Sequence, residues 1–223
     1  MTSLRLAWCF LTTFPASRQG SAEARDFAWS QMWYPAVGAV LGLSWWAVAE
    51  GARLLHAPSP LAAFAILAAM LASTGFLHLD GLLDSADALF VPKSAEDRLR
   101  ILKDVHLGSY AFGVGALWFL GMAASLSALR EPLLLIALPA LSRGVLLLPM
   151  HIFPYARSHD GYGTSFRPPR AAWILPGTCT LAAVAFFPIE AATILVIQIA
   201  FAWRASRRLG GGITGDIYGA CLC

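Results

Sequence analysis

Residues 78–90 read HLDGLLDSADALF, and this stretch decides how the chain is to be interpreted. Asp80, Asp84 and Asp87 are spaced by four and three residues, so a helix would place their carboxylates on one face, within reach of one another. Like charges so close repel unless a cation lies between them. The stretch ends an apolar run, 60–79, that is long enough to cross a membrane. The aspartates are therefore expected at a membrane surface.

The composition is typical of a membrane protein. Of 223 residues, 58% are hydrophobic and 13% are charged, and the mean hydropathy is +0.64, which a soluble domain of this size does not need. The net charge of +3 comes from basic residues between apolar runs, so nucleic acid is not indicated as a partner. The four cysteines lack the spacing of a zinc site or a disulfide scaffold. A single membrane-embedded catalytic domain over residues 1–223 is expected.

The apolar runs predict the fold class. A spanning helix needs about 20 apolar residues, and the chain offers six such runs, with a seventh considered from Ile213. We therefore expect an all-α, polytopic integral membrane protein with six to seven transmembrane helices. The N-terminal run, by contrast, is expected to form an interfacial or half-buried helix. The six candidate spans are 34–53, 60–79, 109–128, 132–152, 171–187 and 188–203.

Basic residues predict the orientation of these spans. If connections alternate between the two sides, 13 Lys and Arg lie on one side, only Arg53 and Arg130 lie on the other, and Arg143 lies inside a span. The positive-inside rule makes the richer side cytoplasmic and places the N-terminus there. The polar stretches 78–109, 155–166 and 207–216 fall on the same side, although the assignment of that side depends on Lys and Arg alone. The active-site segments are therefore expected to face the cytoplasm.

The aspartates indicate a metal. Short carboxylates with Gly81 and Ser85 between them suit Mg²⁺, which takes one or two carboxylates and leaves other positions to water and substrate phosphate. Metal-assisted phosphoryl transfer is the corresponding chemistry. The alternative is a solvated helix start at the membrane surface, where Asp80 favours the positive end of the helix dipole. A glycine hinge, 210–212, could bring Asp216 to the cluster as a further carboxylate.

Basic residues near these stretches could hold phosphate. Arg143 is costly inside a span and marks either a site or a structural ion pair, for example with Glu50. Ser94 with Asp97 predicts a helix cap, followed by an interfacial helix whose cations either snorkel to the surface or hold a phosphorylated substrate. Those polar residues are Arg98, Lys103 and Asp104, and the glycine-containing loop after Tyr155 adds Arg157.

In their order and spacing, the motifs resemble those of the cobalamin synthase family, the adenosylcobinamide-GDP ribazoletransferases. HLDGLLDSADALF, RLRILKDVHLGSYA, SRG, YAR and GGGITGDIYGA together cover residues 75–220. The pattern of the family continues past Cys223 through another apolar stretch, so a truncated C-terminus or a missing final helix is expected. The HxDGxxDxxDG motif falls on His78, Asp80, Gly81, Asp84 and Asp87, with Ala88 in place of glycine; KDxxxG falls on Lys103, Asp104 and Gly108; TGD falls on Thr214, Gly215 and Asp216.

The resemblance implies a multi-pass enzyme of cobalamin biosynthesis in a bacterial or archaeal cytoplasmic (inner) membrane. It would join adenosylcobinamide-GDP to α-ribazole or its 5′-phosphate, giving adenosylcobalamin or its 5′-phosphate and GMP, with Mg²⁺ required. The lipid bilayer is an expected partner, as is a second copy or another cobalamin-assembly enzyme. The expected catalytic residues are Asp80, Asp84, Asp87 and Asp104, the substrate-binding residues are His78, Lys103, Arg143, Arg157, Thr214 and Asp216, and the metal ligands are Asp80, Asp84, Asp87 and Asp216.

Three other classes of protein fit part of this pattern. A CDP-alcohol phosphotransferase would share the chemistry, but its motif needs an Ala-Arg pair where this chain has Asp84 and Ser85. A small-molecule transporter would fit the spans, yet its ionisable groups are expected near the midplane, whereas here the acids gather at one surface. A scaffold without catalysis leaves the aspartates and glycines unexplained.

Overall fold

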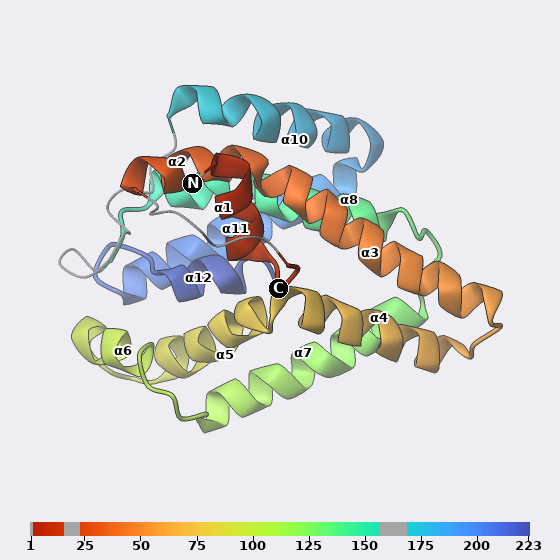
Figure 1. The fold of residues 1–223 in the computed structure, drawn as a ribbon. Coiled ribbons are helices and arrows are strands. Elements are labelled where there is room, and N and C mark those ends of the chain that lie inside the picture. The colour runs from red at the N-terminus through yellow and green to blue at the C-terminus, as the bar shows by residue number, and fades with distance from the viewer. Residues whose placement is uncertain (1, 16–22, 157–168) are drawn as a thin grey trace.

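The computed structural model describes residues 2–15, 23–156 and 169–223 (Figure 1). These residues form helices and connecting segments, and the only strand-like pairing among them is one bridge between Tyr155 and Ile213. The expected all-α class is confirmed. In chain order the elements are α1 (Ser3–Leu11), α2 (Ala24–Ser30), η1 (Gln31–Trp33), α3 (Tyr34–Leu54), α4 (Ser59–Thr74), α5 (Leu77–Phe90), α6 (Ala95–Ile101), α7 (Ser109–Ser127), α8 (Leu134–Val145), α9 (Leu147–Ile152), η3 (Arg170–Trp173), α10 (Ile174–Phe186), α11 (Pro188–Arg208) and α12 (Gly215–Ala220).

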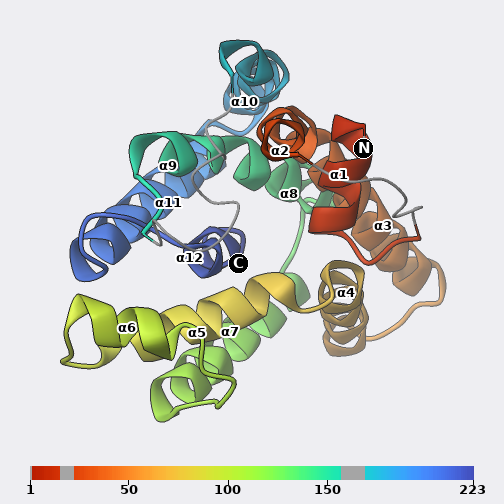
Figure 2. The same cartoon turned by 60° about the vertical axis from the view of Figure 1, so that its left-hand side comes forward.

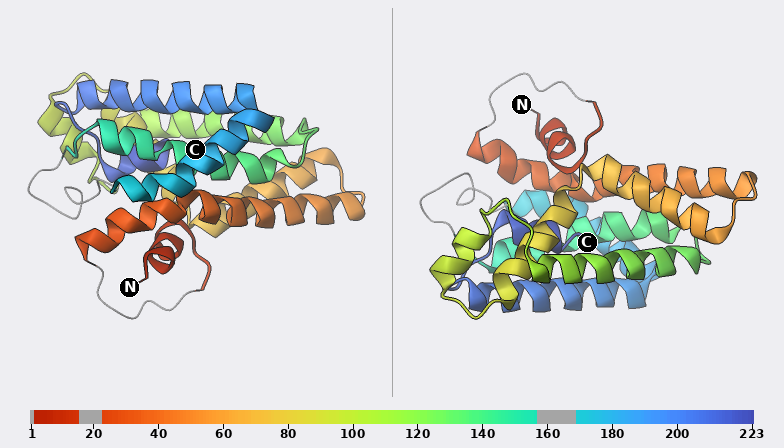
Figure 3. Two further views of the ribbon diagram at one scale, coloured as in Figure 1. Left: turned by 90° about the horizontal axis from the view of Figure 1, so that it is seen from above. Right: turned by 90° about the horizontal axis from the view of Figure 1, so that it is seen from below.

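Several of these helices have the length and apolarity needed to cross a membrane. In the described part of the chain there are four such segments, and five if the bent pair α4–α5 counts as one. The axes of helices α3, α7, α8 and α11 lie roughly parallel to one another (Figure 3). The chain is therefore a helical membrane protein. The four segments are Arg25–Leu54, Ser109–Ser127, Leu134–Ile152 and Pro188–Arg208.

Three of the expected spans differ from the structure. The run 60–79 is not one helix, because Gly75 and Phe76 adopt positive φ angles of 60° and 61°, and α5 is bent by 88° from α4. A glycine in this conformation ends a helix at no steric cost. The run 171–187 forms the end of η3 and the 13-residue α10, and the six-residue α12 occupies the place of the seventh span. Both are much shorter than a membrane is thick.

Close glycine contacts hold α3 against α8. A Cβ atom on Gly38 would lie 2.3 Å from the carbonyl oxygen of Pro139, and one on Gly42 would lie 2.3 Å from that of Leu135. Small residues four apart let helix backbones approach in this way. The contact fixes the position of α8, the helix that carries Arg143.

Helix α5 occupies a central position between α12 and α7, as Figures 1 and 2 show. Helix α6 and the C-terminal end of α11 lie at one end of the molecule, and the turn between α3 and α4 lies at the other (Figure 1). Any site built on α5 therefore has contributions from α7 and α12.

Candidate functional site

The first half of α5 packs closely against α12. A Cβ atom on Gly81 would lie 2.6 Å from the carbonyl oxygen of Asp216, and one on Gly219 would lie 3.6 Å from the Cα of Gly81. The two glycines thus let the helix backbones touch. Two motifs that are far apart in the sequence, HLDG and TGD, are brought together by this contact.

The segment before α12 is shaped by glycine. Gly210 and Gly211 have φ angles of +83° and +104°, which only glycine adopts readily. The chain then pairs with residues 154–156: Ile213 N–H donates to the carbonyl of Pro154, and Ala156 N–H donates to the carbonyl of Ile213, both at 2.9 Å. This turn directs the TGD segment toward α5.

A cavity of about 190 Å³ lies where the two helices meet. His78, Asp80 and Gly81 line it from α5, and Gly215 and Asp216 line it from α12. Within the TGD segment, the buried Thr214 hydroxyl donates to the Asp216 carboxylate at 3.1 Å. The cavity therefore brings together residues from two of the predicted motifs.

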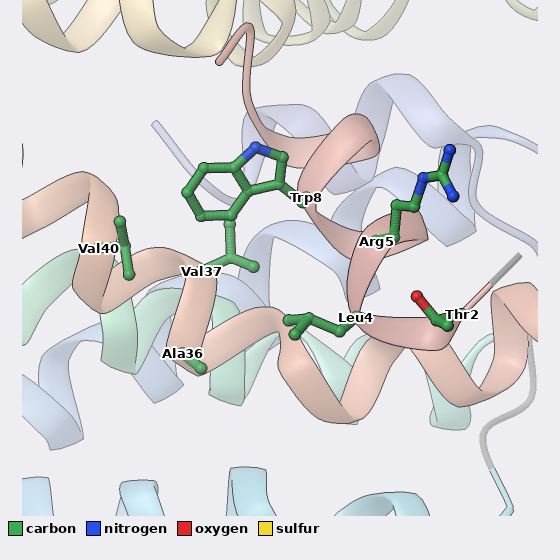
Figure 4. Close-up of a pocket in the computed structure, with 7 residues that line it drawn as sticks. All are labelled: Thr2, Leu4, Arg5, Trp8, Ala36, Val37 and Val40. Carbon is green, nitrogen blue, oxygen red and sulfur yellow. The ribbon is translucent and has the colours of Figure 1, made fainter. Parts of the chain in front are cut away.

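A larger hollow lies elsewhere. It measures about 450 Å³ and is lined by residues of α1 and α3 with Thr2, among them Arg5, Trp8 and Val37 (Figure 4). None of the residues predicted from the sequence to form the site lines it. The cavity between α5 and α12 is therefore the candidate site because of the residues that line it, and not because of its size.

Asp87 has a different environment from Asp80. Its two carboxylate oxygens accept hydrogen bonds from the backbone N–H groups of Gly108, at 2.6 Å, and Ala111, at 2.9 Å. A Cβ atom on Gly108 would lie 2.5 Å from this carboxylate. Asp87 thereby caps the N-terminus of α7 from another helix, a role that an N-cap side chain usually fills locally.

The expected metal ligands are only partly brought together. Asp80 and Asp216 line one cavity, Asp84 is half-buried on the same helix as Asp80, and Asp87 binds the start of α7. Among the described residues, no three His, Cys, Asp or Glu side chains are grouped closely enough to hold a metal ion by themselves. Direct metal binding by these four aspartates stays a prediction.

The KDxxxG segment is exposed between α6 and α7. Asp104 accepts the backbone N–H of His106 at 3.1 Å and contacts its Nδ1 at 2.6 Å. These interactions with His106 lower the pKa of the Asp104 carboxyl. Lys103 is exposed, and neither residue lines the α5–α12 cavity. This segment joins α5 through Gly108.

Arg143 is buried, with only 1% of its surface exposed. Its Nη1 donates to the carbonyl of Pro139 at 3.2 Å and weakly to the Ser142 hydroxyl at 3.4 Å. The alternative ion pair with Glu50 is wrong, because the Glu50 carboxylate binds Arg53, three residues along the same helix. Arg157 lies outside the described residues.

Arg98 is the polar residue whose role the sequence did not predict. It is 4% exposed and donates to the carbonyls of Lys93, at 2.9 Å, and of Ala88 and Leu89, both at 2.8 Å. The prediction that Arg98 is a surface cation available to phosphate is therefore wrong. Its position one helix after α5 was the available signal, since Arg side chains commonly bind the last carbonyls of a helix. The cap by Ser94 and Asp97 is confirmed, with Asp97 N–H donating to Ser94 Oγ at 3.2 Å.

These features define an all-α membrane protein with a polar site where two helices meet. Residues 3–223 match the family model described as cobalamin-5-phosphate synthase, so the chain belongs to that family. The family and the enzyme class expected from the motifs are thereby confirmed.

Curated relatives resemble the chain over nearly its whole length. Three examples follow, each of them named adenosylcobinamide-GDP ribazoletransferase. The protein of Deinococcus radiodurans is 37% identical over 99% of this chain and 81% of its own length. The protein of Desulfitobacterium hafniense is 36% identical over 100% of this chain and 93% of its own length. The protein of Ectopseudomonas mendocina is 38% identical over 100% of this chain and 94% of its own length. No solved structure matches the chain.

Proposed function

We propose that this chain joins adenosylcobinamide-GDP to α-ribazole or its 5′-phosphate and releases GMP, as the names of its relatives suggest. The observation that carries the proposal is the cavity between α5 and α12, which is lined by His78, Asp80 and Asp216. Carboxylates that converge from two helices suit a reaction on phosphoryl groups at a membrane surface.

Mg²⁺ fits the chemistry of these residues, because all the candidate ligands are hard carboxylate oxygens. We propose that Asp80, Asp84 and Asp216 hold it. The earlier prediction also includes Asp87, whose oxygens retain lone pairs beside their bonds to α7. When bound, Mg²⁺ neutralises charge on phosphoryl oxygens.

The residues of the chain then have separate tasks in our proposal. One aspartate accepts the proton of the attacking ribazole hydroxyl, whose oxygen bonds to the phosphorus next to cobinamide while the bond to GMP breaks. Cations stabilise the negative charge on the departing GMP. Arg143, Arg157 and Lys103 are the candidates for this task, with Asp104 as a further carboxylate at the surface.

The proposed location is a bacterial or archaeal cytoplasmic (inner) membrane. The positive-inside rule predicts that the end of the molecule with α6 and the C-terminus of α11 faces the cytoplasm. That end carries Lys93, Arg98, Arg100 and Arg204 with their basic neighbours, whereas Arg53 ends α3 at the opposite end. Association with a second copy or with other cobalamin-assembly enzymes stays a prediction.

GMP release by the full chain in nanodiscs tests this function. We expect release to require adenosylcobinamide-GDP, α-ribazole and Mg²⁺, to stop with EDTA, and to fall at least about a hundredfold in Asp84→Asn, since a lost acid–base or charge-stabilising group typically costs that much. Glu96→Gln, an exposed carboxylate on α6, is the control and should retain activity. Near-normal turnover by Asp84→Asn would contradict the assigned site. No release by the folded wild-type protein would contradict the function.

A further inference from the structure

Two buried polar side chains near the cavity, His78 and Arg143, have nitrogen atoms without hydrogen-bond partners. His78 is 6% exposed and Arg143 is 1% exposed. In the described part of the chain, both ring nitrogens of His78 and the Nε of Arg143 have no partner. Buried polar groups are nearly always hydrogen-bonded, so these nitrogens are suited to bind a polar group of a ligand.

The two side chains share one small cavity. His78 and Arg143 both line a hollow of about 40 Å³, enclosed further by Trp45, Thr74 and Trp118. This space holds about one water-sized group. His78 also lines the cavity of Asp80 and Asp216. It therefore stands between the carboxylates and Arg143.

The charge of Arg143 indicates what the hollow receives. An unpaired cation inside a membrane span is energetically costly unless an anion compensates it. No ion pair of Arg143 occurs among the described residues, and the group that interacts electrostatically with its charge there is Cys223, which lines the same hollow. Glu190 borders a second, larger cavity of about 500 Å³ together with Arg143, so it is the acidic side chain to be tested as an alternative counter-charge.

We propose that His78 and Arg143 form a buried subsite for one phosphoryl oxygen of the nucleotide, reached from the α5–α12 cavity. The subsite rests on the proposed function and adds to it a phosphate contact that needs no metal. Arg143 supplies a charge-assisted hydrogen bond from Nε, and His78 donates from the nitrogen that carries its proton. The oxygen fills the 40 Å³ hollow, and its phosphorus lies toward the carboxylates.

A phosphate could also come from a lipid headgroup, because the 500 Å³ cavity beside Arg143 has mainly apolar walls, including Met122, Ile194 and Leu222. That cavity is lined mainly by α8 and α11, and the membrane-length window of α11 is only 28% buried. The position of His78 on the cavity with Asp80 favours the nucleotide. The test therefore includes both sources.

The experiment measures binding to the full chain in detergent with EDTA present, by calorimetry and by the thermal unfolding midpoint. The probes are GMP, guanosine as the uncharged control, and phosphatidylglycerol. We expect GMP to bind saturably and raise the midpoint, and guanosine to do neither. Arg143→Gln and His78→Gln should each weaken GMP binding at least about tenfold, the usual effect of losing a hydrogen bond to a charged group.

Three further variants make the result specific. Glu96→Gln should keep metal-free GMP binding, since this exposed carboxylate on α6 lies outside the subsite, and Arg143→Lys should keep part of it. Glu190→Gln should leave GMP binding unchanged, and a loss there would overturn the proposal by making Glu190 part of the site. If Arg143→Gln does not fold, His78→Gln carries the test.

Unchanged GMP binding in both variants, no metal-free binding, or an Arg143-dependent response to phosphatidylglycerol alone would overturn the subsite. If turnover persists in any of these cases, the proposed function still stands. Failure of the function would instead appear as no GMP release from the folded wild-type protein.

Discussion

The two halves of α5 carry the same motif but use their polar groups differently. In the second half, Asp87 binds the backbone of α7, while Arg98 and Arg208 bind the carbonyls at the end of the helix. In the first half, His78 has no partner among the described residues, and Asp80 lines a cavity shared with α12. The second half fixes the helix in place, and the first half is open to a ligand.

This difference shows that a residue in a family motif is not necessarily a ligand. The three aspartates are equivalent in a helical projection, yet one of them has both oxygens bonded to the start of another helix. Gly108 belongs to a separate motif, but the contact with Asp87 explains why glycine stands there. The four predictions below test this division of α5, beginning with the largest expected effect.

Gly81→Ala should have the largest effect on activity, because Gly81 lies in the half of α5 that faces the cavity. The new Cβ would meet the Asp216 carbonyl oxygen at 2.6 Å, so α12 must shift away from α5. A displacement of about 1 Å can cost a hundredfold in rate, and we expect GMP release to fall by about that factor while the protein remains folded. Gly113→Ala on α7, where a Cβ meets nothing within 4 Å, is the control. Equal activity of the two variants would show that the α5–α12 contact does not position the site.

Arg98→Gln should mainly reduce stability. The substitution removes a side chain that donates to three carbonyls and leaves buried acceptors without partners. We expect the free energy of unfolding to fall by about 2–3 kcal/mol, measured by thermal unfolding in detergent. Arg100→Gln is the control, because its ion pair with Asp97 is at the surface and such pairs contribute little. An effect no larger than that of the control would contradict the capping role of Arg98.

Asp87→Asn and Gly108→Ala should disturb one contact. Each is expected to lower the free energy of unfolding by about 1–2 kcal/mol, as the loss of a helix cap does. The double variant should lose less than the sum, because both substitutions break the same interaction. Strict additivity would argue against a shared contact. If Asp87→Asn alone also raised the Mg²⁺ concentration for half-maximal rate, Asp87 would be a metal ligand as well as an anchor.

A substitution in the exposed KDxxxG segment should have the smallest effect on stability. The contact with His106 lowers the pKa of Asp104, so its contribution to stability is present above the ordinary carboxyl pKa of about 4 and is lost as pH falls through the lower pKa of the folded state. Asp104→Asn should remove this slight dependence in acid and leave the unfolding midpoint at neutral pH nearly unchanged. A large drop in the unfolding midpoint of Asp104→Asn at neutral pH would mean that Asp104 makes stabilising contacts other than the one with His106.

The sequence predicts the class of the protein and much of its local structure. Hydrophobic composition predicts the helical membrane class, and the order of motifs predicts the family. The helix cap at Ser94 and Asp97 and the helix break before Pro188 can also be predicted from the sequence, because caps and helix breaks depend on residues within one turn. The sequence pattern predicts one continuous span over 60–79, whereas the structure has an 88° bend after Thr74, for which Gly75 is the signal in the sequence.

Only the tertiary structure decided which polar groups remain available. Asp87, Arg98 and Gly81 find their partners on α7, at the end of α5 and on α12, respectively. A helical pattern specifies which residues share a face, since that depends on neighbours three and four positions away. Which atoms meet that face depends on how distant segments pack. The sequence therefore determined that α5 carries a row of carboxylates, whereas packing determined which end of the row is bound and which end faces a cavity.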